Sequence, residues 1–177
     1  ITRAKDASIP VAVLSHVASG KRMGIKTFES HASTQLTAWQ PDLIVLAGFM
    51  RVLSAEFIDN TPAPMINLHP ALLPAYKGLD THQRAIQAGE RYHGCSIHMV
   101  TAELDAGNVL TQAVLAVNPK DTADSLQASV QKGEHQLLPW TILLIAKGVL
   151  NINQLTTQNN DNRSTYLPTL PLKLWLE

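Results

Sequence analysis

The chain of 177 residues has no excess of charge, almost no cysteine and no long apolar run. Lysines and arginines number 14, as do aspartates and glutamates, so nothing predicts a nucleic-acid or membrane surface. Cys95 is the single cysteine, which excludes a disulfide framework and favours a reducing, cytoplasmic compartment. No apolar run approaches the ~20 residues of a membrane span. No basic, apolar and small-residue signal opens the sequence.

Motifs for nucleotides and metals are also missing. The sequence contains no Walker A loop, no G-x-G-x-x-G and no cysteine–histidine spacing typical of zinc. What it does contain is 45% apolar and only 16% charged residues, a mixture typical of a globular enzyme. Its length suits one domain with a sizeable core.

Apolar runs and helical stripes alternate along the chain. The runs predict strands at 9–14, 43–47, 65–68, 95–100 and 109–117. Stripes and caps predict helices ending near residue 7 and at 28–39, 54–60 and 81–88, the last one closed by Gly89. This alternation predicts an α/β domain with a largely parallel sheet and helices on both faces, in which ligands bind beyond the carboxyl ends of the strands. The last two strands are expected to pair antiparallel, because the loop between them is too short for a crossover helix.

The C-terminal part predicts one long helix and a tail. Asp121 or Thr122 caps the helix, which runs toward Lys147, and Gly133 and Pro139 should bend or interrupt it. We expect one domain over residues 1–150 and a loosely held tail over 151–177. The tail carries four apolar residues able to dock: Leu170, Leu172, Leu174 and Trp175.

Asn67 and His69 are the first candidates for chemistry. They lie two apart in an extended segment, so both side chains point to one face, and Pro70 keeps His69 extended. An amide donor beside an imidazole suits a reaction that passes through an oxyanion. Taken alone, however, the spacing favours a strand end with two hydrogen-bonded polar side chains over a catalytic pair.

Two other segments are open to two interpretations each. Asp105 stands before Ala106 and Gly107, a pattern typical of an Asx-turn, and it would orient His69 only if the fold brings the two together. Residues 48–53 stay apolar after a strand end, which fits either core packing or a hydrophobic cleft for a flat ligand. His98 is a further histidine that could face the same site.

Four long motifs, in order, carry a family resemblance. They are PDLIVLAGFMRVLS (41–54), INLHPALLPAYKG (66–78), HGCSIHMVTAELDAGNVLTQ (93–112) and QKGEHQLLP (131–139). From Pro41 to about Gly148 the chain resembles the phosphoribosylglycinamide formyltransferases. The resemblance implies a Rossmann-like formyltransferase fold. It also implies transfer of the formyl group of 10-formyltetrahydrofolate to the amine of glycinamide ribonucleotide in de novo purine biosynthesis, without a metal.

The resemblance also implies which residues act. The catalytic trio matches Asn67, His69 and Asp105. The positions that hold the folate match Met50, Arg51, Val52 and Leu53, with Asn67 contacting it as well. The positions that line the ribonucleotide match Gly48, Pro70 and Glu134. The implied partners are the two small-molecule substrates, with no nucleic acid and no membrane, and the implied state is a monomer or a homodimer.

One part of the family's pattern has no counterpart in this sequence. The family begins with a strand and a glycine-serine-asparagine loop that cradles the ribonucleotide phosphate, whereas this sequence opens at Ile1 beyond that region. We therefore expect the N-terminal strands and the phosphate-binding part to be missing. The alternatives are a formyltetrahydrofolate deformylase and an inactive folate-binding fragment. Deformylases usually have a second histidine where Pro70 stands, which speaks against the first alternative. An inactive folate-binding fragment would need loss of the trio, and the trio is intact.

A first prediction concerns binding by residues 1–177 as an isolated fragment. Backbone N–H groups at a helix N-terminus should supply much of the affinity for a phosphate, and no such loop is present. The fragment should therefore have lost most of its ribonucleotide affinity, while folate binding should suffer less. Calorimetric titration of the fragment and of an upstream-extended version, with each substrate separately, checks this. Equal ribonucleotide affinity in both would place the phosphate site elsewhere.

Overall fold

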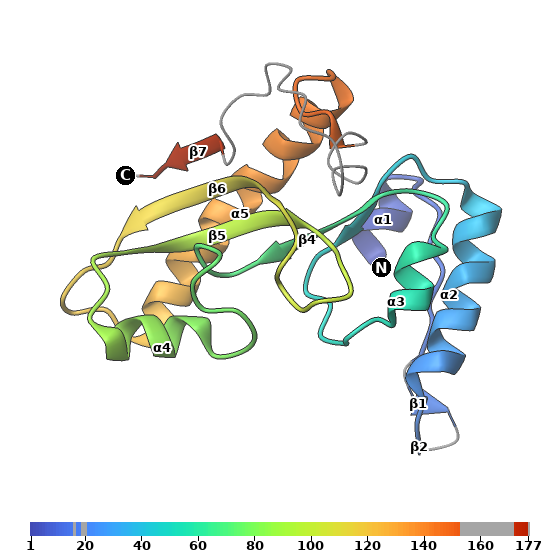
Figure 1. Cartoon of the computed structure of the whole chain (residues 1–177), viewed down its shortest axis with the longest axis horizontal. Coiled ribbons are helices and arrows are strands. Elements are labelled where there is room, and N and C mark those ends of the chain that lie inside the picture. The colour runs from blue at the N-terminus through green and yellow to red at the C-terminus, as the bar shows by residue number, and fades with distance from the viewer. Residues whose placement is uncertain (16, 19–20, 153–171, 177) are drawn as a thin grey trace. The chain divides into compact units, whose positions relative to one another are not determined.

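The computed structural model describes residues 1–15, 17–18, 21–152 and 172–176. The chain forms two compact units (Figure 1). The first comprises Ile1–Asp42 and Arg51–Ala63, and the second comprises Leu43–Met50 and Pro64–Glu177. No helix in the described part of the chain is long and apolar enough to cross a membrane.

The first unit is mainly helical. Its elements are α1 (Thr2–Asp6), β1 (Val17–Ala18), β2 (Lys21–Arg22), α2 (Ile25–Trp39) and α3 (Ala55–Asp59). Ser54 caps α3 as predicted, since its Oγ accepts a hydrogen bond from the Phe57 N–H at 3.2 Å. The buried Glu29 of α2 accepts hydrogen bonds from the Ser54 N–H at 2.6 Å and from the Ser54 hydroxyl at 2.9 Å. This carboxylate therefore fastens α2 to the start of α3.

The strand predicted at residues 9–14 is wrong. The segment has no strand assignment, and Ile9 and Val13 are 57% and 67% exposed. A strand requires a neighbour that completes its hydrogen-bond ladder, and no described residue pairs with this apolar run. A short antiparallel pair, β1 with β2, follows this segment.

The second unit is a mixed five-stranded sheet with helices, which confirms the predicted α/β class (Figure 1). Its elements are β3 (Ile44–Leu46), β4 (Met65–His69), α4 (Thr81–Ala88), β5 (Tyr92–Met99), β6 (Val109–Ala116), α5 (Ala123–Ala146) and β7 (Leu172–Trp175). The strand order is β3-β4-β5-β6-β7. The two outer pairs are parallel and the two inner pairs antiparallel, so the expected antiparallel pairing of β5 with β6 is confirmed.

The long helix α5 begins where a cap was predicted and continues past both predicted breakers. Thr122 Oγ1 accepts from the Ser125 N–H at 3.2 Å, and the helix runs unbroken across Gly133 and Pro139, so the expected interruption is wrong. Gly133 has a packing role, because a Cβ there would lie 2.6 Å from Leu176 Cδ1 and 3.5 Å from Ala113 Cβ. The missing side chain lets α5 lie close to the sheet.

The described end of the tail is more ordered than expected. Residues Leu172–Trp175 form β7, which pairs parallel with β6 from Thr111 to Val114. Leu172 and Leu174 pack against the core, as their predicted docking requires. The Trp175 ring lies edge-on to the Tyr92 ring, with centroids 5.8 Å apart. Leu170 and the rest of 153–171 lie outside the described residues.

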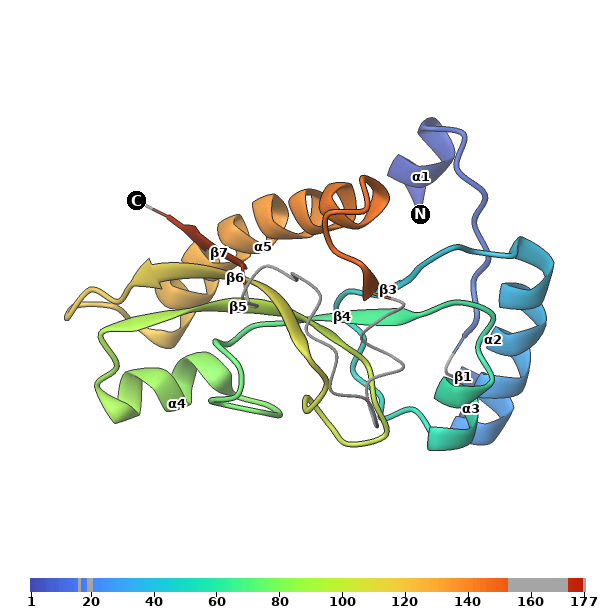
Figure 2. The ribbon, with the colours of Figure 1, turned by 45° about the horizontal axis from the view of Figure 1, so that its top comes forward.

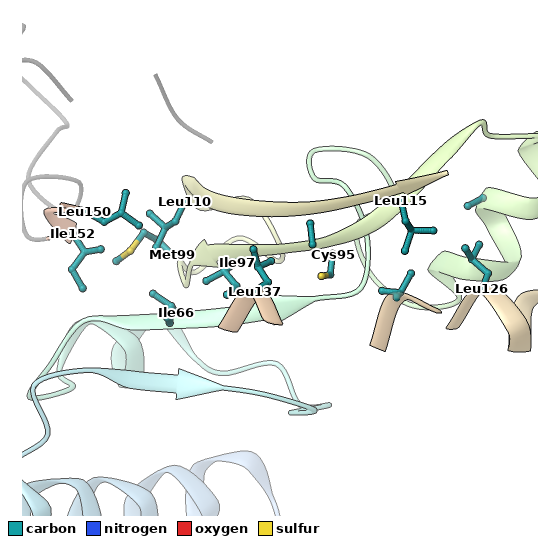
Figure 3. Close-up of a cluster of buried hydrophobic side chains, with 13 residues drawn as sticks. Ile66, Cys95, Ile97, Met99, Leu110, Leu115, Leu126, Leu137, Leu150 and Ile152 are labelled. Carbon is teal, nitrogen blue, oxygen red and sulfur yellow. The ribbon is translucent and has the colours of Figure 1, made fainter. Parts of the chain in front are cut away.

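The core occupies the face of the sheet that α5 covers (Figure 2). Alternation along β5 turns Cys95 and Ile97 to this face, where Figure 3 shows them beside Ile66 and Leu137. Thr111 of β6 and Thr141 of α5 share a buried hydrogen bond of 2.6 Å. The buried cluster consists of Ile66, Ala85, Cys95, Ile97, Met99, Leu110, Ala113, Leu115, Leu126, Val130, Leu137, Leu150 and Ile152. The opposite face of β4–β6 is left for polar side chains.

A second prediction concerns the dependence of stability on pH. Burial lowers the pKa of His93 to about 4, from an ordinary value of 6.5. Between these values the unfolded chain binds a proton that the folded chain does not, so the free energy of unfolding should fall as the pH drops from about 6.5 to about 4. The variant His93→Asn should be less stable at pH 7 but should lose less stability on acidification. Urea unfolding at several pH values measures both, and parallel pH profiles for the two proteins would contradict the prediction.

Candidate active site

Polar side chains gather on the face of the sheet opposite α5. Asn67 and His69 of β4 point to this face, as their spacing predicts. The antiparallel register sets His98 of β5 directly opposite Asn67, and Ser96 opposite His69. Directly opposite residues of an antiparallel pair share a face, so the four side chains lie together.

The 70–80 loop folds over this face and is anchored by a buried polar network. Ser96 Oγ donates to the Ala71 carbonyl at 2.6 Å and accepts from the Leu73 N–H at 3.0 Å. Gln112 Nε2 donates to the Leu73 carbonyl and to Ser96 Oγ, both at 3.0 Å. Ser96 is fully buried and Gln112 nearly so. Because each of these groups is paired inside the protein, the first half of the loop has a defined position.

The second half of the loop supplies two backbone groups to the site. The Tyr76 carbonyl lies 2.9 Å from His69 Nε2 and accepts its N–H. The Gly78 N–H donates to Asp105 Oδ2 at 2.9 Å. The left-handed backbone of Tyr76 and Gly78, with φ of 56° and 82°, turns the chain at this point.

Asp105 joins the two histidines from the loop that follows β5. Its Oδ2 lies 3.4 Å from His69 Nδ1 and its Oδ1 lies 3.5 Å from His98 Nε2, with the carboxylate buried. The structure thus brings Asn67, His69 and Asp105 into one cluster, as we expected. Both ring nitrogens of His69 therefore face oxygen acceptors, the Tyr76 carbonyl at Nε2 and the Asp105 carboxylate at Nδ1.

His98 orients the amide of Asn67. Its Nδ1–H donates to the Met99 carbonyl at 2.8 Å, which leaves Nε2 of the neutral ring as an acceptor for the Asn67 amide at 3.1 Å. Burial lowers the pKa of His98 and so favours this neutral form, although the Met99 hydrogen bond and the Asp105 charge partly offset the effect. The second N–H of the half-buried Asn67 has no partner among the described residues and is available to a substrate oxygen.

The three predicted ribonucleotide positions belong to the same unit. Glu134 is half-buried on α5, without a hydrogen bond or ion pair among the described side chains. Burial raises the pKa of its carboxyl, and the charges of His135 and His69 oppose that rise. Pro70 is half-buried next to His69, and its carbonyl accepts from the Thr81 hydroxyl at 2.6 Å. Gly48 is exposed, with a left-handed φ of 65° after β3.

The four predicted folate positions differ in exposure. Met50, in the second unit, is 72% exposed, and Val52, in the first unit, is 64% exposed. Leu53 is buried. The guanidinium of Arg51 donates to the Met23 carbonyl at 2.9 Å and lies over the Phe28 ring, 4.9 Å from its centroid.

Sequence reasoning missed the most important supports of the trio. His98 was noted only as a histidine that could face the site, although its position opposite Asn67 would follow from a known strand register. The Tyr76 carbonyl and the Gly78 N–H carry no side-chain signal at all. Among the described residues, no group of three or more histidine, cysteine, aspartate or glutamate side chains could hold a metal ion.

Comparison with known proteins identifies the family. Residues 1–142 match the formyl transferase family model. Phosphoribosylglycinamide formyltransferase of Escherichia coli strain K12 is 38% identical over 154 residues, which cover 87% of this chain and 71% of that protein. The chain belongs to the phosphoribosylglycinamide formyltransferases, within the formyl transferase family.

Solved structures of this family have the same fold. The phosphoribosylglycinamide formyltransferase of Coxiella burnetii aligns with a TM-score of 0.75 at 43% identity, over 85% of this chain and 69% of that one. The enzyme of Anaplasma phagocytophilum aligns with a TM-score of 0.78 at 32% identity, over 98% of this chain and 78% of that one. The chicken trifunctional purine biosynthetic protein adenosine-3 is 36% identical over 155 residues, and the chain spans only 15% of its length.

A third prediction tests how Asp105 is placed. A Cβ on Gly107 would lie 1.9 Å from the Met99 carbonyl oxygen, so Gly107→Ala must displace the backbone two residues beyond the carboxylate. We expect the variant to fold with reduced stability and to lose the His69–Asp105 contact, because the loop has to move away from β5. A crystal structure of the variant, with its thermal unfolding, checks this. The exposed Ala102→Ser change in the same loop should leave both unaltered.

Proposed function

We propose that this chain transfers the formyl group of 10-formyltetrahydrofolate to the amine of glycinamide ribonucleotide. The observation that carries the proposal is the buried cluster of Asn67, His69, His98 and Asp105 on one face of the sheet. It combines a fixed amide donor, an imidazole between two acceptors and a carboxylate. Acyl transfer through a tetrahedral oxyanion needs these functions together. The family relationship supplies the substrates.

The reaction follows from the positions of these groups. The ribonucleotide amine attacks the formyl carbon, so a new C–N bond forms and the carbonyl oxygen gains the negative charge. The free N–H of Asn67 donates to that oxyanion, and protonated His69 stabilises it through its positive charge. The bond from the formyl carbon to the folate nitrogen then breaks as the carbonyl re-forms. The proton that leaves the attacking amine reaches the folate nitrogen through His69 or through a water held by Asp105.

Asp105 and His98 keep the reacting groups in the required orientations. The Asp105 carboxylate lies 3.4 Å from His69 Nδ1 and so fixes the orientation of the ring. The neutral His98 accepts one N–H of Asn67 and thereby directs the other. Each role depends on burial, because the same contacts in water would contribute little.

The substrates would contact the remaining predicted residues. We propose that Met50, Arg51, Val52 and Leu53 hold the folate, and that Gly48, Pro70 and Glu134 line the ribonucleotide. The half-buried carboxylate of Glu134 has hydrogen-bonding capacity left over for a polar substrate group. No step in this scheme requires a metal. We place the reaction in the cytoplasm, as part of purine biosynthesis, in a monomer or a homodimer.

A fourth prediction tests the oxyanion role of Asn67. Asn67→Ala should lower kcat by about 10²–10³, because one donor to the developing charge is lost. The matched control is Asn108→Ala, since Asn108 is an exposed asparagine whose side chain makes no hydrogen bond to a described residue. Steady-state formation of formylated ribonucleotide measures both variants. A loss of tenfold or less in Asn67→Ala would reduce Asn67 to a positioning role, and formate release without transfer would instead indicate the deformylase alternative.

A further inference from the structure

Arg84 of α4 reaches back over the 70–80 loop. Its Nη1 donates to the Lys77 carbonyl at 2.7 Å and to the Leu79 carbonyl at 3.2 Å. The guanidinium also lies over the ring of Tyr76, 5.3 Å from the ring centroid. The side chain itself is exposed, and Arg84 lies in the first turn of α4, which follows the loop.

These contacts surround the two backbone groups that serve the active site. The carbonyls held by Arg84 belong to the residues on either side of Gly78, whose N–H donates to Asp105. The ring held by Arg84 belongs to Tyr76, whose carbonyl accepts from His69. One exposed arginine therefore contacts the loop beside both backbone groups, the Tyr76 carbonyl and the Gly78 N–H, through which the loop orients the His69–Asp105 pair.

The loop needs such support because its backbone is unfavourable. Tyr76 and Asp80 have left-handed φ angles of 56°, which side-chain-bearing residues adopt only at a cost in free energy. Its other outer contacts include the Tyr76 hydroxyl donating to Glu90 and the Thr81 hydroxyl donating to the Pro70 carbonyl, both at 2.6 Å, and Lys77 Nζ donating to Glu103 at 3.3 Å. None of these three contacts holds the carbonyl of Lys77 or of Leu79.

We propose that Arg84 is a positioning residue for formyl transfer, which acts through the backbone of residues 76–79 on the His69–Asp105 pair. The expected change in kcat rests on the proposed function. The expected change in the His69 contact rests on the geometry alone. Nη1 of Arg84 donates to both carbonyls while the planar guanidinium lies over the Tyr76 ring, whereas a lysine ammonium has no planar face to lie over that ring. Arg84→Lys should therefore not restore what Arg84→Ala loses.

The first test is kinetic. In Arg84→Ala and Arg84→Lys, kcat should fall by about 10-fold to 10²-fold, as expected for a displaced catalytic group, with both KM values changed little. The matched control is Gln83→Ala, an exposed neighbour on α4 without a side-chain contact to a described residue, and it should retain full kcat. A raised KM with unchanged kcat would mean that Arg84 binds substrate directly, and would overturn the proposal.

A double-mutant cycle with Asp105→Asn separates a positioning effect from an independent one. If Arg84 acts through the pair, Arg84→Ala should cost much less in the Asp105→Asn background than in the parent protein. If Arg84→Ala lowers kcat by the same factor in both backgrounds, the two residues act independently and the proposal is overturned. Thermal unfolding of the single variants accompanies the cycle, so that a loss of folded protein is not counted as a loss of kcat.

The last measurement does not depend on activity. In protein labelled with ¹⁵N-histidine, the His69 Nε2–H that donates to Tyr76 should exchange slowly with solvent. The exchange should quicken in Arg84→Ala and stay slow in Gln83→Ala. Unchanged exchange in Arg84→Ala would refute the positioning role whatever the kinetics. If the parent protein shows no formyl transfer while the exchange still quickens, the proposed function fails and the structural link between Arg84 and His69 stands.

Discussion

The buried charge of Asp105 is the constraint on which the rest of the site depends. A carboxylate removed from water is costly unless the protein replaces its hydration with donors and opposite charge. Here Oδ2 receives the Gly78 N–H and faces His69. The left-handed backbone at Gly78 and the anchoring of the 70–80 loop are both needed to bring that N–H to the carboxylate.

The sheet separates two environments, and the chemistry requires both. The face toward α5 is apolar and packed closely enough that Gly133 has no room for a side chain. The opposite face of the same strands carries Asn67, His69, Ser96 and His98. Because successive side chains of a strand point to opposite faces, a single strand such as β5 contributes to the core and to the site at once. The side chains of the candidate site therefore project from strands that the packed core holds in place.

Sequence patterns predicted secondary structure correctly where the conformation of a short segment depends only on its own residues. Thr81–Ala88 is a helix that ends at Gly89 in a left-handed conformation, as its sequence predicted, because a helix stop needs only the residue that can adopt positive φ. The apolar run at 9–14 failed for the opposite reason, since a strand exists only with a partner. The same reasoning explains β7: the apolar residues of the tail predicted docking, but the strand exists because it pairs with β6.

The sequence by itself determined that Asn67 and His69 share a face, because the two-residue period of an extended chain is a local property. Its motifs also determined the family. Only the tertiary structure decided that Asp105 meets His69, that His98 lies opposite Asn67, and that the Tyr76 carbonyl and the Gly78 N–H complete the cluster. These contacts join residues 7 to 36 positions apart in the chain, and they depend on strand register and on the path of a loop. Side-chain spacing carries no information about either, since register and loop path are set by packing across the whole sheet.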